Sequence, residues 1–243
     1  MNKNYKILCC KDDSDKHHIN KEHIWSLPAR IAVTGRSMVS GKSNFCVNIL
    51  ARFYDKDFDG ENIWLVSPSL NTPKLKMLAK YKKIPDSNLF SQFDEEVLNE
   101  LYELIKDKYR SAIDLKEKPK HCCIVFDDVS WSGDLRGQKY GIISKLACNS
   151  RHYLCTCILI SQSYMDILPS FRQNMSGLVA FQCSLKEVEN IADEHNTVTS
   201  RRNFIKKFQE ATKKKHDFFS IDYSKDTGRR FKHNLNEIIK MDS

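Results

Sequence analysis

The chain has 243 residues, of which 41% are hydrophobic and 29% are charged, and its formal net charge is +8. This length supports one substantial hydrophobic core and is short for two full domains. No apolar run reaches the roughly 18–20 residues that cross a bilayer, and the N-terminal apolar patch is too short for a signal peptide. We therefore expect a globular protein of a cytosol-like compartment, with no membrane partner.

The nine cysteines fit a reducing compartment, where disulfides are rare. Their number is odd, and several lie in segments expected to be strands, where a reduced thiol packs as a small hydrophobe. No paired Cys-x-x-Cys motif is present in the sequence, so the pattern argues against a zinc site.

Short apolar runs alternate with helix-periodic segments along most of the chain. The expected strands are residues 30–34, 62–66, 121–126, 156–160 and 177–182, and the expected helices are residues 42–54, 71–83, 94–111, 136–150 and 185–195. This alternation predicts an α/β fold around a mainly parallel sheet, whose strands are covered on both faces. Residues 1–24 are polar and without periodicity, so we expect a flexible arm before a core of residues 25–197.

The first expected strand leads into the most informative motif. Residues 30–43 combine an apolar strand, a loop of small residues and Gly-Lys-Ser, directly before a helix. This is the context of a phosphate-binding P-loop, in which loop N–H groups and the positive end of the helix converge on an anion. Lys42 would reach the β- and γ-phosphates of ATP, and the Ser43 hydroxyl would ligate Mg²⁺. The predicted nucleotide-binding residues are Gly35, Ser40, Gly41, Lys42, Ser43 and Asn44.

The spacing of this motif is irregular, because five residues separate Gly35 from Gly41 where four are usual. Either the loop carries one extra residue, or Gly35 is only the turn that ends the strand. A chance Gly-Lys-Ser at the start of a helix is the alternative to a P-loop.

A pair of carboxylates, Asp127 and Asp128, directly follows the apolar run of residues 121–126. In P-loop NTPases the first such residue holds Mg²⁺, together with the P-loop hydroxyl, and the adjacent one commonly orients or deprotonates the attacking water. We therefore assign Asp127 to Mg²⁺ and Asp128 to the water. Capping of the following segment by Asp128 is the alternative.

The next expected strand ends in Ser161, Gln162 and Ser163. In hydrolytic P-loop motors an additional strand lies between the phosphate-binding and metal-binding strands, and its polar tip reaches the γ-phosphate. Gln162 is therefore the expected sensor, and the fold expected is a three-layer P-loop NTPase of the additional-strand class. A solvated strand end would explain Gln162 equally.

Two arginines are candidates for an arginine finger, which stabilises charge on the transferring phosphoryl group of a neighbouring subunit. Arg151 directly precedes the sensor strand, and Arg172 lies between that strand and the next one. A favourable cation at a helix C-terminus would also explain Arg151, and a surface loop position would explain Arg172.

Beyond residue 197 the alternation of strands and helices stops. Residues 198–215 are expected to form a helix and residues 217–234 a hairpin, which together make a small appendage of residues 198–243. Residues 201–243 hold twelve Lys and Arg against six Asp and Glu. Such a basic segment favours a polyanionic partner, with nucleic acid the leading candidate, and a solvated helix surface is the alternative.

Taken in order, these motifs resemble those of the FtsK/HerA superfamily, and above all the poxvirus-type genome-packaging ATPases of large DNA viruses and their virophages. The resemblance covers roughly residues 28–195 and depends on residues 31–43, 124–128, 149–152, 158–163 and 171–181. It implies an ATP- and Mg²⁺-dependent homo-oligomeric ring that moves double-stranded DNA into a preformed viral capsid. It also favours Arg151 as the trans-acting arginine, and it implies a location in viral factories of the host cytoplasm and in the virion.

Within that interpretation, the loop of residues 130–139 could project into a central channel. Its Arg136 and Lys139 are candidate DNA contacts, although helix capping also explains the composition of this loop. Two other functions stay open, a nucleoside or nucleotide kinase and a non-catalytic DNA-binding module with a degenerate nucleotide fold. The paired carboxylates and the additional strand argue against the kinase, and the irregular P-loop is the only support for the degenerate module.

Overall fold

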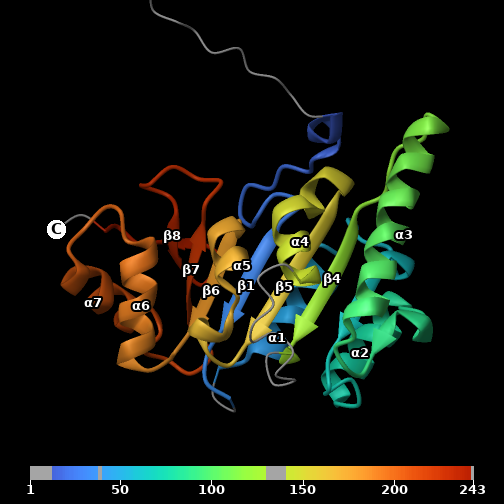
Figure 1. Ribbon diagram of the computed structural model, residues 1–243. Coiled ribbons are helices and arrows are strands. Elements are labelled where there is room, and N and C mark those ends of the chain that lie inside the picture. The colour runs from blue at the N-terminus through green and yellow to red at the C-terminus, as the bar shows by residue number, and fades with distance from the viewer. Residues whose placement is uncertain (1–12, 38–39, 130–140, 242–243) are drawn as a thin grey trace, which may run out of the picture.

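The structure is a computed structural model that describes residues 13–37, 40–129 and 141–241. Within these residues a nine-stranded sheet has the order β3-β2-β4-β5-β1-β6-β7-β8-β9 (Figure 1). Six strands pair in parallel: β1 (Arg30–Thr34), β2 (Ile63–Val66), β3 (Leu89–Phe90), β4 (Cys122–Asp127), β5 (Cys155–Ser161) and β6 (Gly177–Phe181). Three pair antiparallel beyond them: β7 (Phe218–Asp222), β8 (Phe231–His233) and β9 (Glu237–Ile238).

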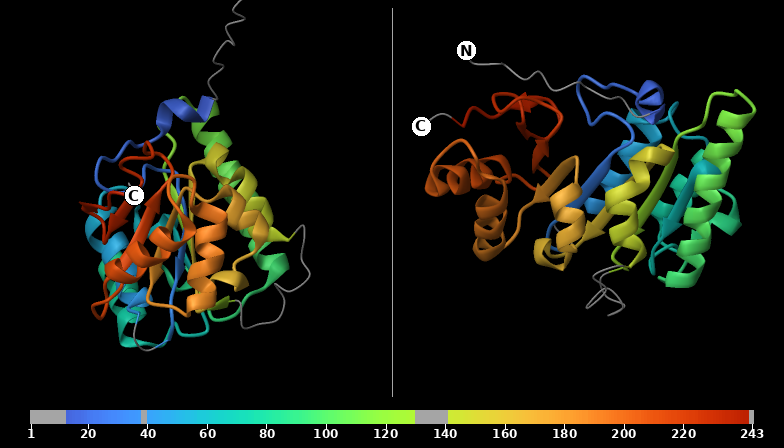
Figure 2. Two further views of the ribbon diagram at one scale, coloured as in Figure 1. Left: turned by 90° about the vertical axis from the view of Figure 1, so that its left-hand side faces the viewer. Right: turned by 45° about the horizontal axis from the view of Figure 1, so that its top comes forward.

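Helices cover both faces of the sheet (Figure 2). One face carries α1 (Lys42–Asn48), which continues as a π-helical segment to Phe53, and α2 (Pro73–Lys82). The other carries α3 (Glu95–Asp114), α4 (Ile142–Asn149), α5 (Pro169–Asn174), α6 (Leu185–His195) and α7 (Arg201–Ala211). The expected three-layer α/β fold with a mainly parallel sheet is therefore confirmed. No helix in the described ranges is long and apolar enough to cross a membrane.

The strands are unbroken apolar runs because both of their faces are covered. Every residue of β4 and β5 is buried. Along β4, Ile124 and Phe126 pack against the layer of α3 and α4, whereas Cys123 and Val125 pack against the layer of α1 and α2. Burial of a side chain such as Phe126 contributes about 1.5–3 kcal/mol, and a polar substitution on either face of β4 would lose it.

Strand β5 lies between β1 and β4, where the additional strand of a hydrolytic motor is expected. Because β1 to β6 are all parallel, their carboxyl ends meet at one edge of the sheet, toward which the arrowheads of β4 and β5 point in Figure 1. We call this the carboxyl edge. Ligands of such sheets bind beyond it, and the segments after β1, β4 and β5 all leave the sheet there.

The basic C-terminal segment continues the sheet instead of standing outside it. The expected helix and hairpin are present as α7, β7 and β8, but β7 pairs along the whole of β6. Four phenylalanines of these elements pack against one another in the core shared with α3 to α6: Phe204, Phe208, Phe219 and Phe231. This segment therefore covers the β6 side of the central sheet.

The described part of the N-terminal arm packs on the protein as well. A short 3-10 helix spans Asp13–His17, and Lys21 forms a 2.6 Å ion pair with Asp57. Ile19 exchanges backbone hydrogen bonds of 2.9 and 2.8 Å with Leu27, and Ile24 is buried in the core. Trp25, which follows the arm, donates from Nε1 to the carbonyl of Ile221 at 2.9 Å. From residue 13 onward the arm thus belongs to the folded unit.

Candidate active site

The P-loop geometry requires glycine at two positions. Gly35 and Gly41 have φ values of +152° and +91°, which side chains rarely adopt. A Cβ built on Gly35 would also lie 2.7 Å from Cβ of Phe181 and 2.9 Å from Cβ of Ser40. Gly35 therefore follows the end of β1 and packs directly against Ser40, the residue before Gly41. Residues 38 and 39 of the loop lie outside the described ranges, so the two explanations of the irregular spacing stay open.

Lys42 is buried in this loop. Its Nζ donates to the carbonyl of Gly35 at 2.5 Å and to Oγ of Ser40 at 3.4 Å. Burial lowers the pKa of Lys42, and the nearby carboxylates of Asp128 and Asp127 oppose that change. The ammonium group predicted to bind phosphate is thus within electrostatic reach of both carboxylates that end β4.

Asp127 lies at the end of β4 and is only 7% exposed. Burial raises the pKa of this carboxyl, and the hydroxyl of Ser67, which donates to Oδ2 at 3.2 Å, opposes the increase. Asp127 reinforces the effect of burial in raising the pKa of the Cys46 thiol on α1. The electrostatic influence of the carboxylate thus extends to the helix that follows the P-loop.

Asp128 turns away from the strand in a left-handed conformation with φ +59°. Its backbone N–H donates to the carbonyl of Ile160 at 3.0 Å, and its Oδ2 accepts from Nε2 of Gln162 at 2.7 Å. The structure thus brings together the residues predicted to position water and to sense the γ-phosphate, because β4 and β5 are neighbours. Their catalytic roles stay predictions.

The donor set at this edge suits magnesium, which prefers oxygen ligands. Ser43 is partly exposed in the first turn of α1, and Asn44 beside it is exposed. The Ser43 and Ser67 hydroxyls and the Asp127 carboxylate are all hard oxygen donors. These residues fit Mg²⁺, and the assignment of Ser43 and Asp127 as its ligands stays a prediction.

Sequence reasoning missed two residues that organise the site. Ser67, which bonds Asp127, directly follows the apolar strand β2 and could have been found by the same signal as Gln162. Glu187 forms a capping box with Ser184 at the start of α6, and its Oε1 accepts from the backbone N–H of Tyr164 at 3.0 Å. Glu187 thereby tethers the segment that carries Gln162 to α6, which the capping pattern alone does not predict.

The two candidate arginines lie in different places, and Arg151 is far from the end of β5 that faces the P-loop. Arg151 is exposed in the turn before β5, whereas Gln162 follows the end of that strand. The seven residues of β5 rise about 3.3 Å each, so these two positions are about 20 Å apart. Arg172 lies in α5 and pairs with Glu194 of α6 at 3.4 Å. The roles of both arginines stay predictions.

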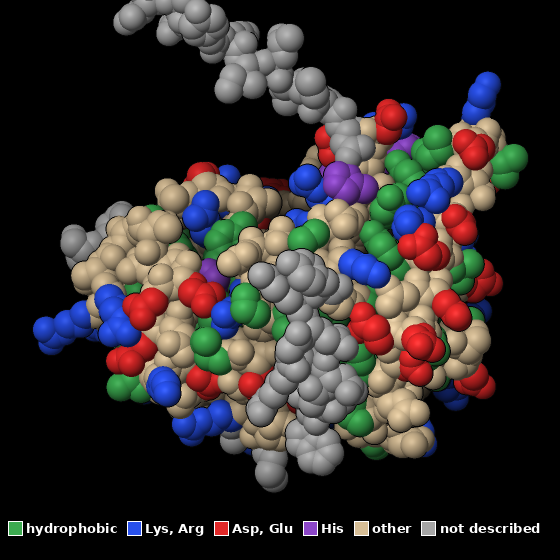
Figure 3. Space-filling view, viewed as in Figure 1, with side chains coloured by type: hydrophobic (Ala, Val, Ile, Leu, Met, Phe, Trp, Pro, Cys, Tyr) green, Lys and Arg blue, Asp and Glu red, His purple; other side chains and the backbone are tan. Residues whose placement is uncertain are grey.

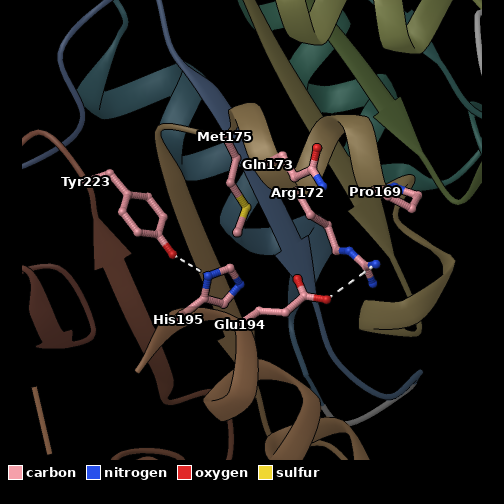
Figure 4. A pocket seen from close by; sticks show the side chains of 7 residues that line it. All are labelled: Pro169, Arg172, Gln173, Met175, Glu194, His195 and Tyr223. Carbon is pink, nitrogen blue, oxygen red and sulfur yellow. Dashed lines mark hydrogen bonds and ion pairs between the residues drawn. The ribbon is translucent and has the colours of Figure 1, made fainter. Parts of the chain in front are cut away.

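Arg172 belongs to a partly buried polar network at a pocket of about 590 Å³ between α5, α6 and the end of β7 (Figure 4). Its guanidinium lies 5.2 Å from the ring centre of Tyr164. Tyr164 donates to Glu194 and contacts Nε2 of His195, whose Nδ1 contacts the hydroxyl of Tyr223, each at 2.5 Å. The pocket is lined by Pro169, Arg172, Gln173, Met175, Glu194, His195 and Tyr223.

Arg136 and Lys139, the candidate DNA contacts, lie outside the described residues.

Comparison with known protein families shows to which family the chain belongs. The model of the Poxvirus A32 protein family matches residues 16–228. The chain belongs to this family. The match confirms the resemblance to the poxvirus-type packaging ATPases that the ordered motifs indicate. No curated protein sequence matches the chain.

Solved structures similar to this family member share its fold. The genome packaging NTPase B204 from Sulfolobus turreted icosahedral virus 2, in complex with AMP, is 13% identical, with a TM-score of 0.55 over 86% of this chain and 97% of that one. Its complex with ATP-gammaS is 14% identical, with the same TM-score over 86% and 98%. The pCW3 conjugation coupling protein TcpA is 14% identical, with a TM-score of 0.57 over 89% of this chain and 61% of that one. These likenesses confirm the P-loop NTPase fold.

Proposed function

We propose that this chain is an ATP-hydrolysing motor that moves double-stranded DNA into a viral capsid as a homo-oligomeric ring. Membership of the Poxvirus A32 protein family supports a packaging ATPase. The similar solved structures include a viral genome packaging NTPase and a conjugation coupling protein. Viral factories in the host cytoplasm, and the virion, are the locations that this function requires.

The observation that carries the proposal is the pairing of Gln162 with Asp128 beside the P-loop. Lys42 would bind the β- and γ-phosphates, and Ser43 and Asp127 would hold Mg²⁺, which neutralises charge on those phosphates. Asp128 would orient the attacking water, and Gln162 would report the γ-phosphate through their shared hydrogen bond. A water-activating carboxylate linked to a sensor suits hydrolysis, whereas a kinase must exclude water from its phosphoryl group.

DNA binding is supported by exposed cations in the C-terminal segment. Arg202, Lys206 and Arg229 are exposed, whereas Arg201 is bound by Asp193 at 2.6 Å. On the face that carries α3 to α7, basic and acidic side chains are intermixed (Figure 3). Scattered cations suit contacts with the phosphate backbone, which carries no sequence information, and a packaging motor must move along any sequence.

The principal test is ATP hydrolysis by the full chain with and without double-stranded DNA. We expect DNA to raise the rate and Lys42→Ala to abolish it, since the loss of the phosphate-binding ammonium removes transition-state charge stabilisation. Lys74→Ala, at an exposed position of α2, is the matched control and should hydrolyse ATP like the wild type. Transfer of phosphate to a nucleoside at a rate that DNA does not change would instead show that the protein is a nucleoside kinase.

In the proposed ring, Arg151 of one subunit would reach the P-loop of the next subunit. The distance of Arg151 from the P-loop of its own chain supports this trans role. Doping Arg151→Ala protein into wild-type protein should reduce ATP hydrolysis more steeply than dilution, because each variant subunit disables a neighbour's site. Arginine fingers contribute about 10³–10⁵-fold in rate. Lys186→Ala, in α6, provides the doping control, and a loss linear in the Arg151→Ala fraction would refute the trans role.

A further inference from the structure

A basic turn of the C-terminal segment lies directly against the P-loop. Residues 212–217 join α7 to β7, and Lys213, Lys214, Lys215 and His216 are all exposed. A Cβ built on Gly41 would lie 3.1 Å from Nδ1 of His216. The imidazole therefore packs on the backbone of the residue that caps α1, although the two are far apart in the sequence.

Strand pairing explains why this turn is at the P-loop. β7 runs antiparallel to β6 and pairs Phe218 with Phe181, so β7 begins where β6 ends, at the carboxyl edge. The ring of Phe218 lies 5.4 Å from the ring of Phe45 on α1 and 5.2 Å from that of Phe181. Since His216 precedes Phe218 by two residues, this aromatic cluster fixes it beside the P-loop.

Hydrogen bonds anchor the end of this turn to the loop after β8. The Asp217 carboxylate contacts Nε2 of His233 at 2.9 Å and accepts from Asn234 at 3.3 Å, and Oδ1 of Asn234 accepts from the backbone of Phe218 at 3.1 Å. His216 itself has a φ of +72°, which is unfavourable for a residue with a side chain. Such strain persists where the surroundings impose it, and it often accompanies a binding role.

The order of the strands shows which part of a nucleotide would meet this turn. β1 leads into the P-loop, and the Mg²⁺ and γ-phosphate residues Asp127, Asp128 and Gln162 come from β4 and β5, on one side of β1. The triphosphate chain that starts from these residues must therefore extend toward the other side. That side is formed by β6 and the start of β7, where His216 lies.

We propose that the α7–β7 turn is the nucleoside-binding side of the ATP site, with His216 packing against the nucleoside and the lysines at 213–215 attracting its phosphates. This inference rests on the proposed nucleotide site and assigns a substrate contact to the C-terminal segment. An imidazole can stack on a base of any identity, because every base has a π-face. Three exposed lysines beside it add positive potential that favours a polyanionic ligand.

The test compares two ligands that differ by an adenosine, ADP and inorganic pyrophosphate, each titrated with Mg²⁺ into the full chain by calorimetry. His216→Asn removes the ring and still accepts a positive φ. We expect it to weaken ADP binding about tenfold, as a lost stacking contact does, and to leave pyrophosphate binding unchanged. His23→Asn, at a side chain that is 79% exposed, is the matched control.

Equal losses for both ligands, or no loss for either, would overturn the nucleoside contact. A wild-type chain that binds neither ligand would instead overturn the proposed function itself. Replacing the lysines at 213–215 with alanine should weaken ADP binding about threefold at low salt, since screened surface charges act weakly. The same replacement of Lys74, Lys76 and Lys80 on α2 is the control. Weakened DNA binding with unchanged ADP binding would overturn the role given to the three lysines.

Discussion

Two groups of polar side chains flank the segment after β5, and they differ in how their charges are balanced. At the carboxyl edge, Asp127 and Asp128 are adjacent like charges, and burial raises the pKa of Asp127. In the pocket network, Arg172 pairs with Glu194, and each hydroxyl and ring nitrogen of the tyrosines and His195 has a partner. Two adjacent carboxylates, one of them buried, face the single ammonium of Lys42, and like charges this close cost stability unless a further cation joins them. The carboxyl edge is therefore suited to binding a cationic ligand, whereas the pocket network is suited to stabilising the fold.

The hydrogen bonds of the pocket network define the protonation of His195. Tyr164 donates its hydroxyl hydrogen to Glu194, so Nε2 of His195 must donate to the oxygen of Tyr164. Nδ1 then accepts from the hydroxyl of Tyr223. A neutral imidazole thus gives both ring nitrogens and both tyrosine hydroxyls a partner, whereas a second proton on Nδ1 would require the Tyr223 hydroxyl to turn from donor to acceptor. The network ties α6 to the segment after β5 and to the end of β7.

The largest effect that separates the two groups should come from Asp128→Asn. We expect the rate of ATP hydrolysis to fall about 10²–10⁴-fold, as when a general base is lost. The melting temperature should change little, because Asp128 is partly exposed and carries no buried ion pair. Steady-state hydrolysis and thermal unfolding of the same preparations measure both quantities.

Glu194→Gln is the matched substitution in the pocket network and should show the opposite pattern. It removes the partner of Arg172 and weakens the acceptor of Tyr164, so stability should fall by about 1–3 kcal/mol while hydrolysis per folded molecule stays within a few-fold. If Glu194→Gln abolished hydrolysis without loss of stability, the pocket network would belong to the chemistry and the comparison would fail.

Much of the fold and of the carboxyl edge could be predicted because their signals are local. Unbroken apolar runs identified the strands buried on both faces, and polar residues directly after them identified Asp127, Asp128 and Gln162. The neighbouring positions of β4 and β5 then followed from the expected additional strand. The role of Gly35 could not be assigned from the sequence. Glycine is required at this position because the backbone lies close to Phe181 on β6, and the spacing of the motif does not show that contact.

The remaining features depend on contacts between segments that lie far apart in the sequence. The pocket network joins Tyr164, His195 and Tyr223 from three different elements, and none of them carries a motif. His216 meets Gly41 only because β7 pairs with β6. The lysine clusters of the C-terminal segment are visible in the sequence, but their composition does not show that one of them lies at the P-loop.

The pocket network should also make the stability of the protein depend on pH. Burial, reinforced by Arg172, lowers the pKa of His195 to about 4 from its ordinary 6.5. Below pH 6.5 the unfolded chain takes up a proton that the folded chain refuses, so stability should decrease as the pH falls toward 4, by about 3 kcal/mol from this residue. Urea unfolding at a series of pH values between 4 and 7 measures this loss of stability.

His195→Gln isolates this contribution, since glutamine can hydrogen-bond without titrating. Its stability at pH 7 should be lower than that of the wild type, because the geometry with Tyr164 and Tyr223 is imperfect, but the difference should shrink as the pH falls. His23→Gln, at an exposed position, should follow the wild-type profile. If wild type and His195→Gln lost stability in parallel from pH 6.5 to 4, His195 would be charged in the folded protein. The pocket network would then carry an unbalanced charge like the carboxyl edge, and the distinction between a ligand site and a structural network would no longer hold.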